Sequence, residues 1–378
     1  MSGGTMRAGP AAGSAASVWR HAAAAVFPAD ALSPAGLAAL YLFLAVLVTA
    51  PFWGDSYIVT LGTLILYSSL VGQSWNLMLG FAGLLSIGHA LFVGLGAYTA
   101  GFLFAKAGIP PIVGFVPAVA VAVLAGSFIG YLGFRYSVGG VYFALLTIAF
   151  AEFTRIMVEH AGFLDGTQGL FLPVSQADRK GVDLINLRGH PVMFYFVIMA
   201  LSFGALLLSR ALLRSKLGYY WQAIRDDQDA AQSLGINVLR YKMYAVMISS
   251  GMAGIAGVFY AFYSNSLFPD STFGIERSIE VTLAPIVGGV GTLFGPIFGT
   301  FILTPLGEVI TWLIGALKSA GVIDPALKLN GLKLLVWGIA VVLIVLFKPR
   351  GLWPWFRDRL GLLRKARDDG DTGGRGDG

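Results

Sequence analysis

The amino-acid sequence predicts an all-α, polytopic membrane protein with about eight to ten transmembrane helices, some of them broken by glycine and proline. Hydrophobic residues make up 56% of the 378 positions and charged residues only 12%, whereas soluble domains carry about 25% charged residues. The mean hydropathy is +0.75, and the apolar residues come in runs of the roughly 20 residues that a helix needs to cross a bilayer. Most of the outer surface is therefore expected to face lipid.

Two functional classes are disfavoured by the composition. The chain has no cysteine, and its four histidines are scattered without the spacing of metal ligands, so neither a metal site nor a thiol site is expected. The net charge of +6 follows the membrane topology described below, so nucleic acid is not expected as a partner. No catalytic residue and no cofactor are predicted.

The apolar runs give the expected elements in chain order. Ser33-Pro34 is typical of a helix start, with proline at the first helical position. The last run is closed by Lys348-Pro349-Arg350 and then by two tryptophans, which suit the headgroup layer. Residues 281–318 are long enough for two passes but contain three prolines and a glycine cluster, and a tight turn is expected near residue 304. The expected spans are residues 35–53, 57–79, 84–105, 110–134, 140–158, 191–212, 241–264, two within 281–318, and 331–347.

Three regions follow from this pattern. Residues 1–34 form a flexible cytoplasmic segment without the short apolar core and cleavage site of a signal peptide. Residues 35–347 form the transmembrane domain, and residues 348–378 form a polar cytoplasmic tail that is expected to be disordered.

The basic residues predict the orientation. With both termini in the cytoplasm, about two in three of the 26 lysines and arginines fall at or beside cytoplasmic segments, as the positive-inside rule requires. Eight spans with re-entrant segments would also place both termini on the same side of the membrane, as ten spans do.

The largest cytoplasmic loop, residues 213–240, is expected to hold an amphipathic helix. Residues 219–234 contain no proline or glycine, their apolar positions fall mostly at helical spacing, and Gly235 follows them. Such a helix either rests on the lipid headgroups or serves as a docking element for a soluble partner.

Two glycine-rich stretches, residues 80–96 and 288–299, occupy comparable places in the two halves of the chain. Both contain too much glycine for a sturdy continuous helix, and paired interrupted segments often line the substrate route of transporters. The candidate pathway or gate residues are Gly83, Ser86, Gly88, His89, Gly289, Gly291 and Gly295.

Four motifs in the same order resemble the branched-chain amino-acid permease family of ABC importers, in its LivM-like half. They are NLMLGFAGLLSIGHALFVGLGAY at residues 76–98, GGVYFALLT at 139–147, the loop run AIRDDQDAAQSLG at 223–235, and SIEVTLAPIVGGVGTLFGPIFG at 278–299. LFKPRGL closes the last span as in the family, and the resemblance covers about residues 40–352. Tyr219 departs from it, since the family usually has arginine there, and so does DGTQGL at residues 165–170.

The resemblance implies a permease subunit in the bacterial cytoplasmic (inner) membrane. Its implied partners are a second homologous permease subunit, two cytoplasmic ATP-binding subunits and a periplasmic substrate-binding protein. The chain itself has no Gly-x-x-x-x-Gly-Lys-Ser/Thr loop, so ATP hydrolysis is expected in the partners and not here. The residues implied to couple the permease to the ATPases are Ala223, Ile224, Arg225, Asp226, Ala230, Ala231 and Gly235.

Several polar residues within the spans leave two interpretations open. His89 is either a pathway residue or a packing residue that bonds a neighbouring helix, and packing is favoured. Glu152 and Arg155 stand one helical turn apart and are expected to form a structural ion pair. Glu280 and Glu308 flank the second glycine-rich stretch, and the sequence assigns neither of them a role.

The preferred function is a permease subunit that forms the pathway for branched-chain or other hydrophobic amino acids in an ATP-driven importer. One alternative is an ABC permease for another small solute, such as urea, a short amide or a sugar. The other is an ion-coupled secondary transporter or channel, which would need buried carboxylates along the pathway and would leave the loop helix unexplained.

Overall fold

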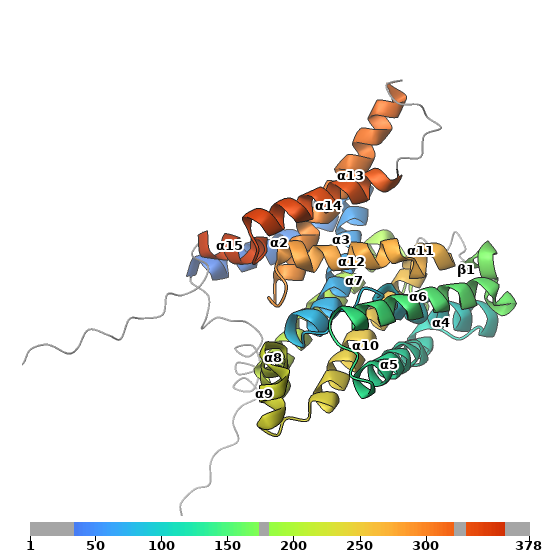
Figure 1. The fold of residues 1–378 in the computed structure, drawn as a ribbon. Helices are drawn as coiled ribbons and strands as arrows, with labels where there is room; N and C mark the ends of the chain where they lie inside the picture. Colours follow the sequence, from blue (N-terminus) through green and yellow to red (C-terminus); the bar gives the residue numbers. More distant parts are fainter. Residues whose placement is uncertain (1–33, 174–180, 321–329, 360–378) are drawn as a thin grey trace, which may run out of the picture. The chain divides into compact units, whose positions relative to one another are not determined.

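The computed structural model describes residues 34–173, 181–320 and 330–359, and this part of the chain is almost entirely helical (Figure 1). Four strands of two residues each are its only extended elements, which confirms the all-α prediction. The helices are α2 (Pro34–Trp53), α3 (Ser56–Asn76), the π-helix η1 (Leu77–Phe81), α4 (Ala90–Ala107), α5 (Pro111–Arg135), α6 (Val141–His160), the 3₁₀ turns η2 (Gly162–Leu164) and η3 (Gly166–Gln168), α7 (Pro191–Arg214), α8 (Lys216–Asp226), α9 (Gln228–Ser233), α10 (Val238–Ser264), α11 (Pro269–Phe273), α12 (Ile275–Gly288), α13 (Gly295–Ser319), α14 (Asn330–Phe347) and α15 (Leu352–Arg359).

Seven helices in the described part are long and apolar enough to cross a membrane, so the chain is a multi-pass membrane protein. Two shorter apolar stretches, Tyr41–Trp53 in α2 and Leu335–Ile344 in α14, also match spans that the sequence predicts. The long spans are Ser56–Phe81, Ala90–Ala107, Pro111–Arg135, Val141–His160, Pro191–Arg214, Val238–Ser264 and Gly295–Ser319.

The chain divides into two compact units, and the larger one holds everything that follows. It comprises Val48–Trp355, while the smaller consists of Met1–Leu47 and Phe356–Gly378. Of the predicted flexible segment at residues 1–34, only Pro34 lies among the described residues. Within the tail predicted to be disordered, residues 348–378, residues 352–359 form α15, and residues 360–378 lie outside the described part.

The turn expected near residue 304 is wrong. α13 runs unbroken from Gly295 to Ser319 and contains Pro305 in its interior. A membrane helix tolerates such a proline because its neighbours can satisfy the freed carbonyl. The chain turns at residues 289–294 instead, between α13 and the 14-residue helix α12, which is shorter than a full span.

The span expected at residues 84–105 begins six residues late. α3 passes into the π-helix η1, residues 82–89 are not regular helix, and α4 starts only at Ala90. Both glycine-rich stretches therefore contain a break in the helical backbone, as the sequence predicted.

Small residues set the packing of α4, α5 and α10 in the core. A Cβ added at Gly96 of α4 would lie 2.8 Å from the Cα of Gly254 in α10. One added at Gly126 of α5 would lie 2.7 Å from the Cβ of Ser250, also in α10. In lipid the hydrophobic effect does little to hold helices together, so membrane helices depend on close van der Waals packing between small residues such as these.

Charged and extended residues gather at the end of the larger unit where α6 stops. Strand β1 (Leu170–Phe171) pairs antiparallel with β4 (Ser266–Leu267), and β2 (Val182–Asp183) pairs with β3 (Arg188–Gly189). The expected Glu152–Arg155 ion pair is present at 2.6 Å. Arg155 also lies 2.5 Å from Asp270, so this cluster joins α6 to α11 and supports the structural interpretation.

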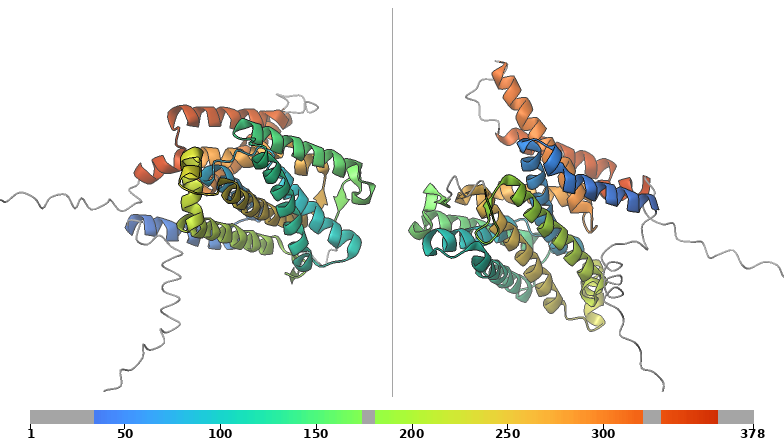
Figure 2. Two further views of the ribbon diagram at one scale, coloured as in Figure 1. Left: turned by 60° about the horizontal axis from the view of Figure 1, so that its bottom comes forward. Right: turned by 180° about the vertical axis from the view of Figure 1, so that it is seen from behind.

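Helices α8 and α9 lie at the opposite end of the larger unit from β1, beside α7 and α10 (Figures 1 and 2). The turn at residues 289–294 contacts the same end, as the hydrogen bonds below establish.

Candidate functional site

Helix α8 is fixed to the spans on either side of it. Trp221 is fully buried, and its Nε1 donates to the carbonyl of Tyr241 in α10 at 2.8 Å. The rings of Tyr220 and Tyr241 lie 4.6 Å apart. Gly218 packs against the backbone of Leu213 at the end of α7, where an added Cβ would lie 2.5 Å from the Cα. The helix is therefore packed directly against the ends of α7 and α10.

The single loop helix expected over residues 219–234 is in fact two helices, because Asp227 ends one and starts the next. Its backbone is extended (φ −153°), and its Oδ1 accepts from the N–H groups of Asp229 and Ala230, each at 2.9 Å. An aspartate in this position caps a helix N-terminus better than it continues a helix. The predicted end at Gly235 is confirmed, with a left-handed φ of +84° just after α9.

Arg225 points from α8 into the space between the two broken segments. Its Nη1 donates to the carbonyl of Gly80 at 2.6 Å. A Cβ added at Gly83 would lie 3.0 Å from the Cγ of Arg225, and one added at Gly291 would lie 3.1 Å from Nη1. One side chain of the loop thus touches both broken segments, and its bond to Gly80 is charge-assisted and correspondingly strong.

Asn76, the last residue of α3, joins the same two segments directly. Its Oδ1 accepts from the N–H of Gly291 at 2.8 Å, and its Nδ2 donates to the carbonyl of Thr292 at 2.9 Å. The side chain is only 2% exposed, so both bonds form away from bulk water, where an unpaired amide would be costly. We call the set Asn76, Gly80, Gly83, Arg225, Gly291 and Thr292 the glycine junction.

Two glycines of the junction need their lack of a side chain. Gly83 has φ +71° and Gly291 has φ +76°, a left-handed conformation that other residues adopt at a cost of about 1–2 kcal/mol. At Gly291 the space is also occupied, because an added Cβ would lie 2.9 Å from the carbonyl oxygen of Gly80.

The first broken segment is held by α3 and α6. His89 is fully buried, and its Nε2 lies 2.8 Å from the Oγ of Ser74 in α3. The carbonyl of Ser86 accepts from Nε1 of Trp75 at 2.6 Å. The N–H of Gly88 donates to Oγ1 of Thr147 at 3.2 Å.

Gly88 packs closely against the backbone of α6. A Cβ added there would lie 3.0 Å from the N of Ile148 and closer still to the backbone of Thr147. The structure brings Gly83 and Gly291 together at the junction, while Ser86, Gly88 and His89 lie against α3 and α6.

The second broken segment is closed by Thr292. Its Oγ1 donates to the carbonyl of Gly289 at 2.7 Å and accepts from the N–H of Gly295 at 3.0 Å. The chain after α14 lies against this turn: a Cβ added at Gly351 would lie 2.6 Å from the N of Gly289. Gly289 and Gly295 thus shape the turn. Gly291 is the glycine of this turn that belongs to the glycine junction.

The predicted coupling residues divide into a buried and an exposed set. Ile224 and Ala231 are 4% and 2% exposed and face the protein, and Ala223 is half-buried. Asp226, Ala230 and Gly235 are exposed, and so is Arg225, although its guanidinium reaches Gly80. Tyr219 of α8 and Leu234, which follows α9, are 69% and 83% exposed. This surface therefore presents apolar and acidic groups.

The sequence-based reasoning missed Asn76, Gly80 and Thr292 as site residues. A signal existed for Asn76, because an amide inside an apolar run must find partners. Its partners lie more than 200 residues away, and no local pattern identifies them. Among the described residues no group of three or more His, Asp and Glu is placed to hold a metal ion.

Comparisons with known proteins identify the family of this chain. The sequence model of the family described as "Branched-chain amino acid transport system / permease component" matches residues 57–346. The LivM permease protein of the high-affinity branched-chain amino acid transport system of Escherichia coli (strain K12) is 28% identical over 86% of this chain and 77% of that protein. A probable LivM of Methanocaldococcus jannaschii is 22% identical over 75% of this chain and 90% of that protein.

A permease named for a different cargo is similar over a shorter range. The autoinducer 2 import system permease LsrC of Enterobacter sp. (strain 638) is 27% identical over 51% of this chain and 54% of that protein. No solved structure gives a significant match. The residues matched by the family model include the whole glycine junction.

Proposed function

Since the chain belongs to the branched-chain amino-acid transport permease family, we propose that it forms the translocation pathway of an ATP-driven importer for branched-chain or other hydrophobic amino acids. Its proposed partners are a second, related permease subunit, two cytoplasmic ATP-binding subunits and a periplasmic substrate-binding protein. Membrane-embedded permease subunits of this family are transport components, so the chemistry of ATP hydrolysis belongs to the partners.

One observation carries this proposal: the Arg225 side chain lies between the two broken segments. Force applied to the exposed face of α8 and α9 reaches Gly80 and Gly291 through a single guanidinium. Because Trp221 and Gly218 fix α8 to α10 and α7, a displacement of the loop also displaces these two spans. A passive loop on the headgroups would need neither contact.

Amino acids are the preferred cargo because the LivM proteins match more of this chain than LsrC does. The E. coli LivM match covers 86% of the chain and the LsrC match 51%. An ion-coupled transporter is the alternative from another class, and it would run on an ion gradient without ATP.

The test is reconstitution of the complete complex in liposomes, with leucine, the binding protein and ATP. We expect leucine uptake that stops without ATP and continues when proton and sodium gradients are abolished by ionophores. The isolated chain is expected to hydrolyse no ATP. Uptake that depends on an ion gradient and not on ATP would support the ion-coupled alternative instead.

Orientation is proposed from the distribution of basic residues, with α8, α9 and both termini in the cytoplasm. A reporter enzyme active only in the cytoplasm should work when it is fused after Arg367 or inserted near Asp227, and it should fail near Asp178. Activity at Asp178 together with silence at the other two sites would reverse the orientation and remove the docking surface from the ATPases.

A further inference from the structure

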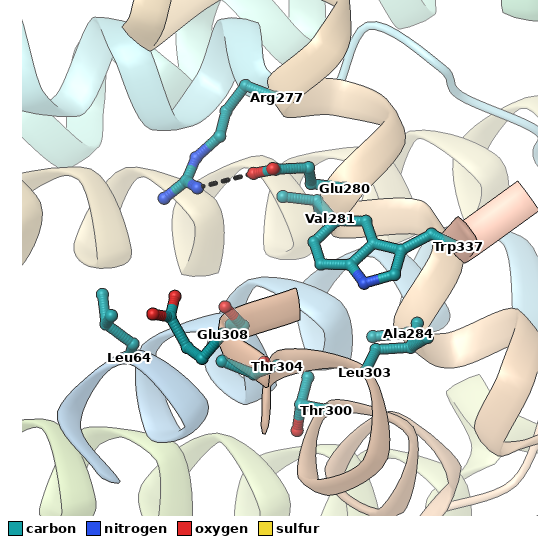
Figure 3. Close-up of a pocket in the computed structure, with 11 residues that line it drawn as sticks. Leu64, Arg277, Glu280, Val281, Ala284, Thr300, Leu303, Thr304, Glu308 and Trp337 are labelled. Atoms are coloured by element: carbon teal, nitrogen blue, oxygen red, sulfur yellow. Dashed lines mark hydrogen bonds and ion pairs between the residues drawn. The ribbon is translucent and has the colours of Figure 1, made fainter. Parts of the chain in front are cut away.

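A small charged cavity lies inside the larger unit, between α3, α12, α13 and α14 (Figure 3). Its volume of about 80 Å³ is several times the roughly 10–15 Å³ that one buried water molecule needs. Arg277 and Glu280 of α12 and Glu308 of α13 line it together with Thr300 and Thr304. Glu308 belongs to a membrane span, Gly295–Ser319, and ionisable residues within such spans are costly and often mark the route of a solute.

Arg277 is held in place on the wall of the cavity. Its Nη1 lies 3.0 Å from the carboxylate of Glu280, one helical turn along α12. Its guanidinium also lies 5.2 Å from the ring centre of Tyr67 and 5.4 Å from that of Tyr260, and both distances fall within the range of cation–π attraction. A guanidinium has five N–H donors, so Arg277 keeps donors available for an anionic group of a solute.

Glu308 stands in the middle of α13, and no hydrogen bond or ion pair joins it to any other residue that the structure describes. It continues a polar stripe, because Thr300, Thr304 and Glu308 follow each other at four-residue intervals on one face of the helix. Figure 3 shows its carboxylate and the Arg277 side chain pointing into the same space.

The charges of the cavity do not balance. One guanidinium and two carboxylates leave an excess of one negative charge when all three are ionised. The ion pair between Arg277 and Glu280 accounts for two of the charges, and the third, on Glu308, has no counter-charge among the described residues. Glu308 is partly buried, and a carboxylate withdrawn from water without a partner is costly. The group that Glu308 itself favours beside it is therefore cationic.

We propose that this cavity binds the charged backbone groups of an amino acid during its passage. The α-ammonium group lies against Glu308, the α-carboxylate accepts from Arg277, and the apolar side chain contacts Leu303 and Trp337. This inference rests on the proposed function and names the chemistry within its pathway: a zwitterion, and not a sugar or another uncharged solute.

The cavity is connected to the glycine junction along α12. This helix carries Arg277 and Glu280 in its first turns and ends at Gly288, next to the turn that holds Gly291. Its 14 residues span about 21 Å, with Pro285 in the last turn. A displacement of Gly291 by Arg225 therefore shifts both charged side chains of α12 relative to Glu308 on α13.

The experiment compares Glu308→Gln with Glu308→Asp and with a control, Glu276→Gln, which removes an exposed carboxylate of α12. Each variant is assembled into the complete complex in liposomes. Leucine uptake is measured over a range of leucine concentrations, together with the ATPase activity that the loaded binding protein stimulates.

We expect Glu308→Gln to lower the maximal rate of uptake at least tenfold. Its KM for external leucine and its stimulated ATPase activity should stay within about twofold of the wild type, because the binding protein and the coupling loop are unchanged. Glu308→Asp should recover a third or more of the uptake, and Glu276→Gln should match the wild type.

Two results would overturn the inference. Uptake by Glu308→Gln within twofold of the wild type would show that the carboxylate does not meet the cargo. Equal loss of uptake and of stimulated ATPase activity, not restored by Glu308→Asp, would assign Glu308 to assembly. Failure of the wild-type complex to transport leucine would instead refute the proposed cargo, so the two failures are distinguishable.

Discussion

Replacement of Arg225 by glutamate is expected to lower leucine uptake by about two orders of magnitude while the complex still assembles. The change removes the charge-assisted bond to the Gly80 carbonyl and sets a carboxylate against that same oxygen. Hydrogen bonds to charged groups contribute about 1.5–3 kcal/mol, and each 1.4 kcal/mol corresponds to a factor of ten. The measurements are ATP-dependent uptake in liposomes and ATPase activity stimulated by the loaded binding protein, each per amount of complex.

The controls separate the contact from the charge. Arg225→Lys keeps a cationic donor and should retain a measurable part of the uptake. Arg135→Glu makes the same charge reversal at the end of α5, on a side chain that is exposed, and should leave uptake within twofold. If Arg225→Glu transported like Arg135→Glu, the glycine junction would not couple the loop helices to the broken segments. The Arg225 contact would then no longer support the proposed function.

The second large effect is expected for Gly291→Ala, the smallest change that fills the junction. The new methyl group would lie 2.9 Å from the Gly80 oxygen and 3.1 Å from Nη1 of Arg225. The left-handed backbone, with φ +76°, adds a strain of about 1–2 kcal/mol. Uptake should fall at least tenfold, because Arg225 and the turn cannot both keep their positions.

Two other glycines serve as controls for Gly291→Ala. Gly204 lies inside α7 with nothing within 4 Å of an added Cβ, so Gly204→Ala should transport normally and be slightly more stable. Gly126→Leu should instead lower the thermal stability of the complex, because its side chain would overlap Ser250 of α10. Equal loss of assembly in Gly291→Ala and Gly126→Leu would make Gly291 a packing position and remove it from the proposed pathway.

The parts of the fold that depend on local composition could be predicted from the sequence. Apolar runs placed most spans within a few residues, and glycine content correctly marked residues 80–96 and 288–299 as interrupted. The errors arose where a local signal had two meanings. Pro305 suggested a turn but is tolerated inside α13, and Asp227 fitted a continuous helix but caps a new one.

The site itself could be predicted only in part, because its contacts join distant segments. Arg225, Gly83 and Gly291 were expected to matter for separate reasons, in the loop and in the two breaks. These residues contact one another because α3, α8 and the turn before α13 pack together. The periodicity of the sequence does not predict that packing. Asn76 makes two bonds to that turn, and its spacing along α3 gives no hint of either.

The Asn76 amide is synthesised long before its hydrogen-bond partners, because the ribosome makes the chain from the N-terminus onward. Its acceptor bond is to a residue 215 positions later, and Gly80 meets Arg225 145 positions later. At about 5–20 residues per second, the ribosome needs roughly 10–40 s to supply Gly291 after Asn76. Until then the amide and the carbonyl lack the partners that they have in the folded protein, in surroundings where unsatisfied polar groups are costly. A nascent chain that stops before residue 291 therefore keeps an Asn76 amide without these two partners.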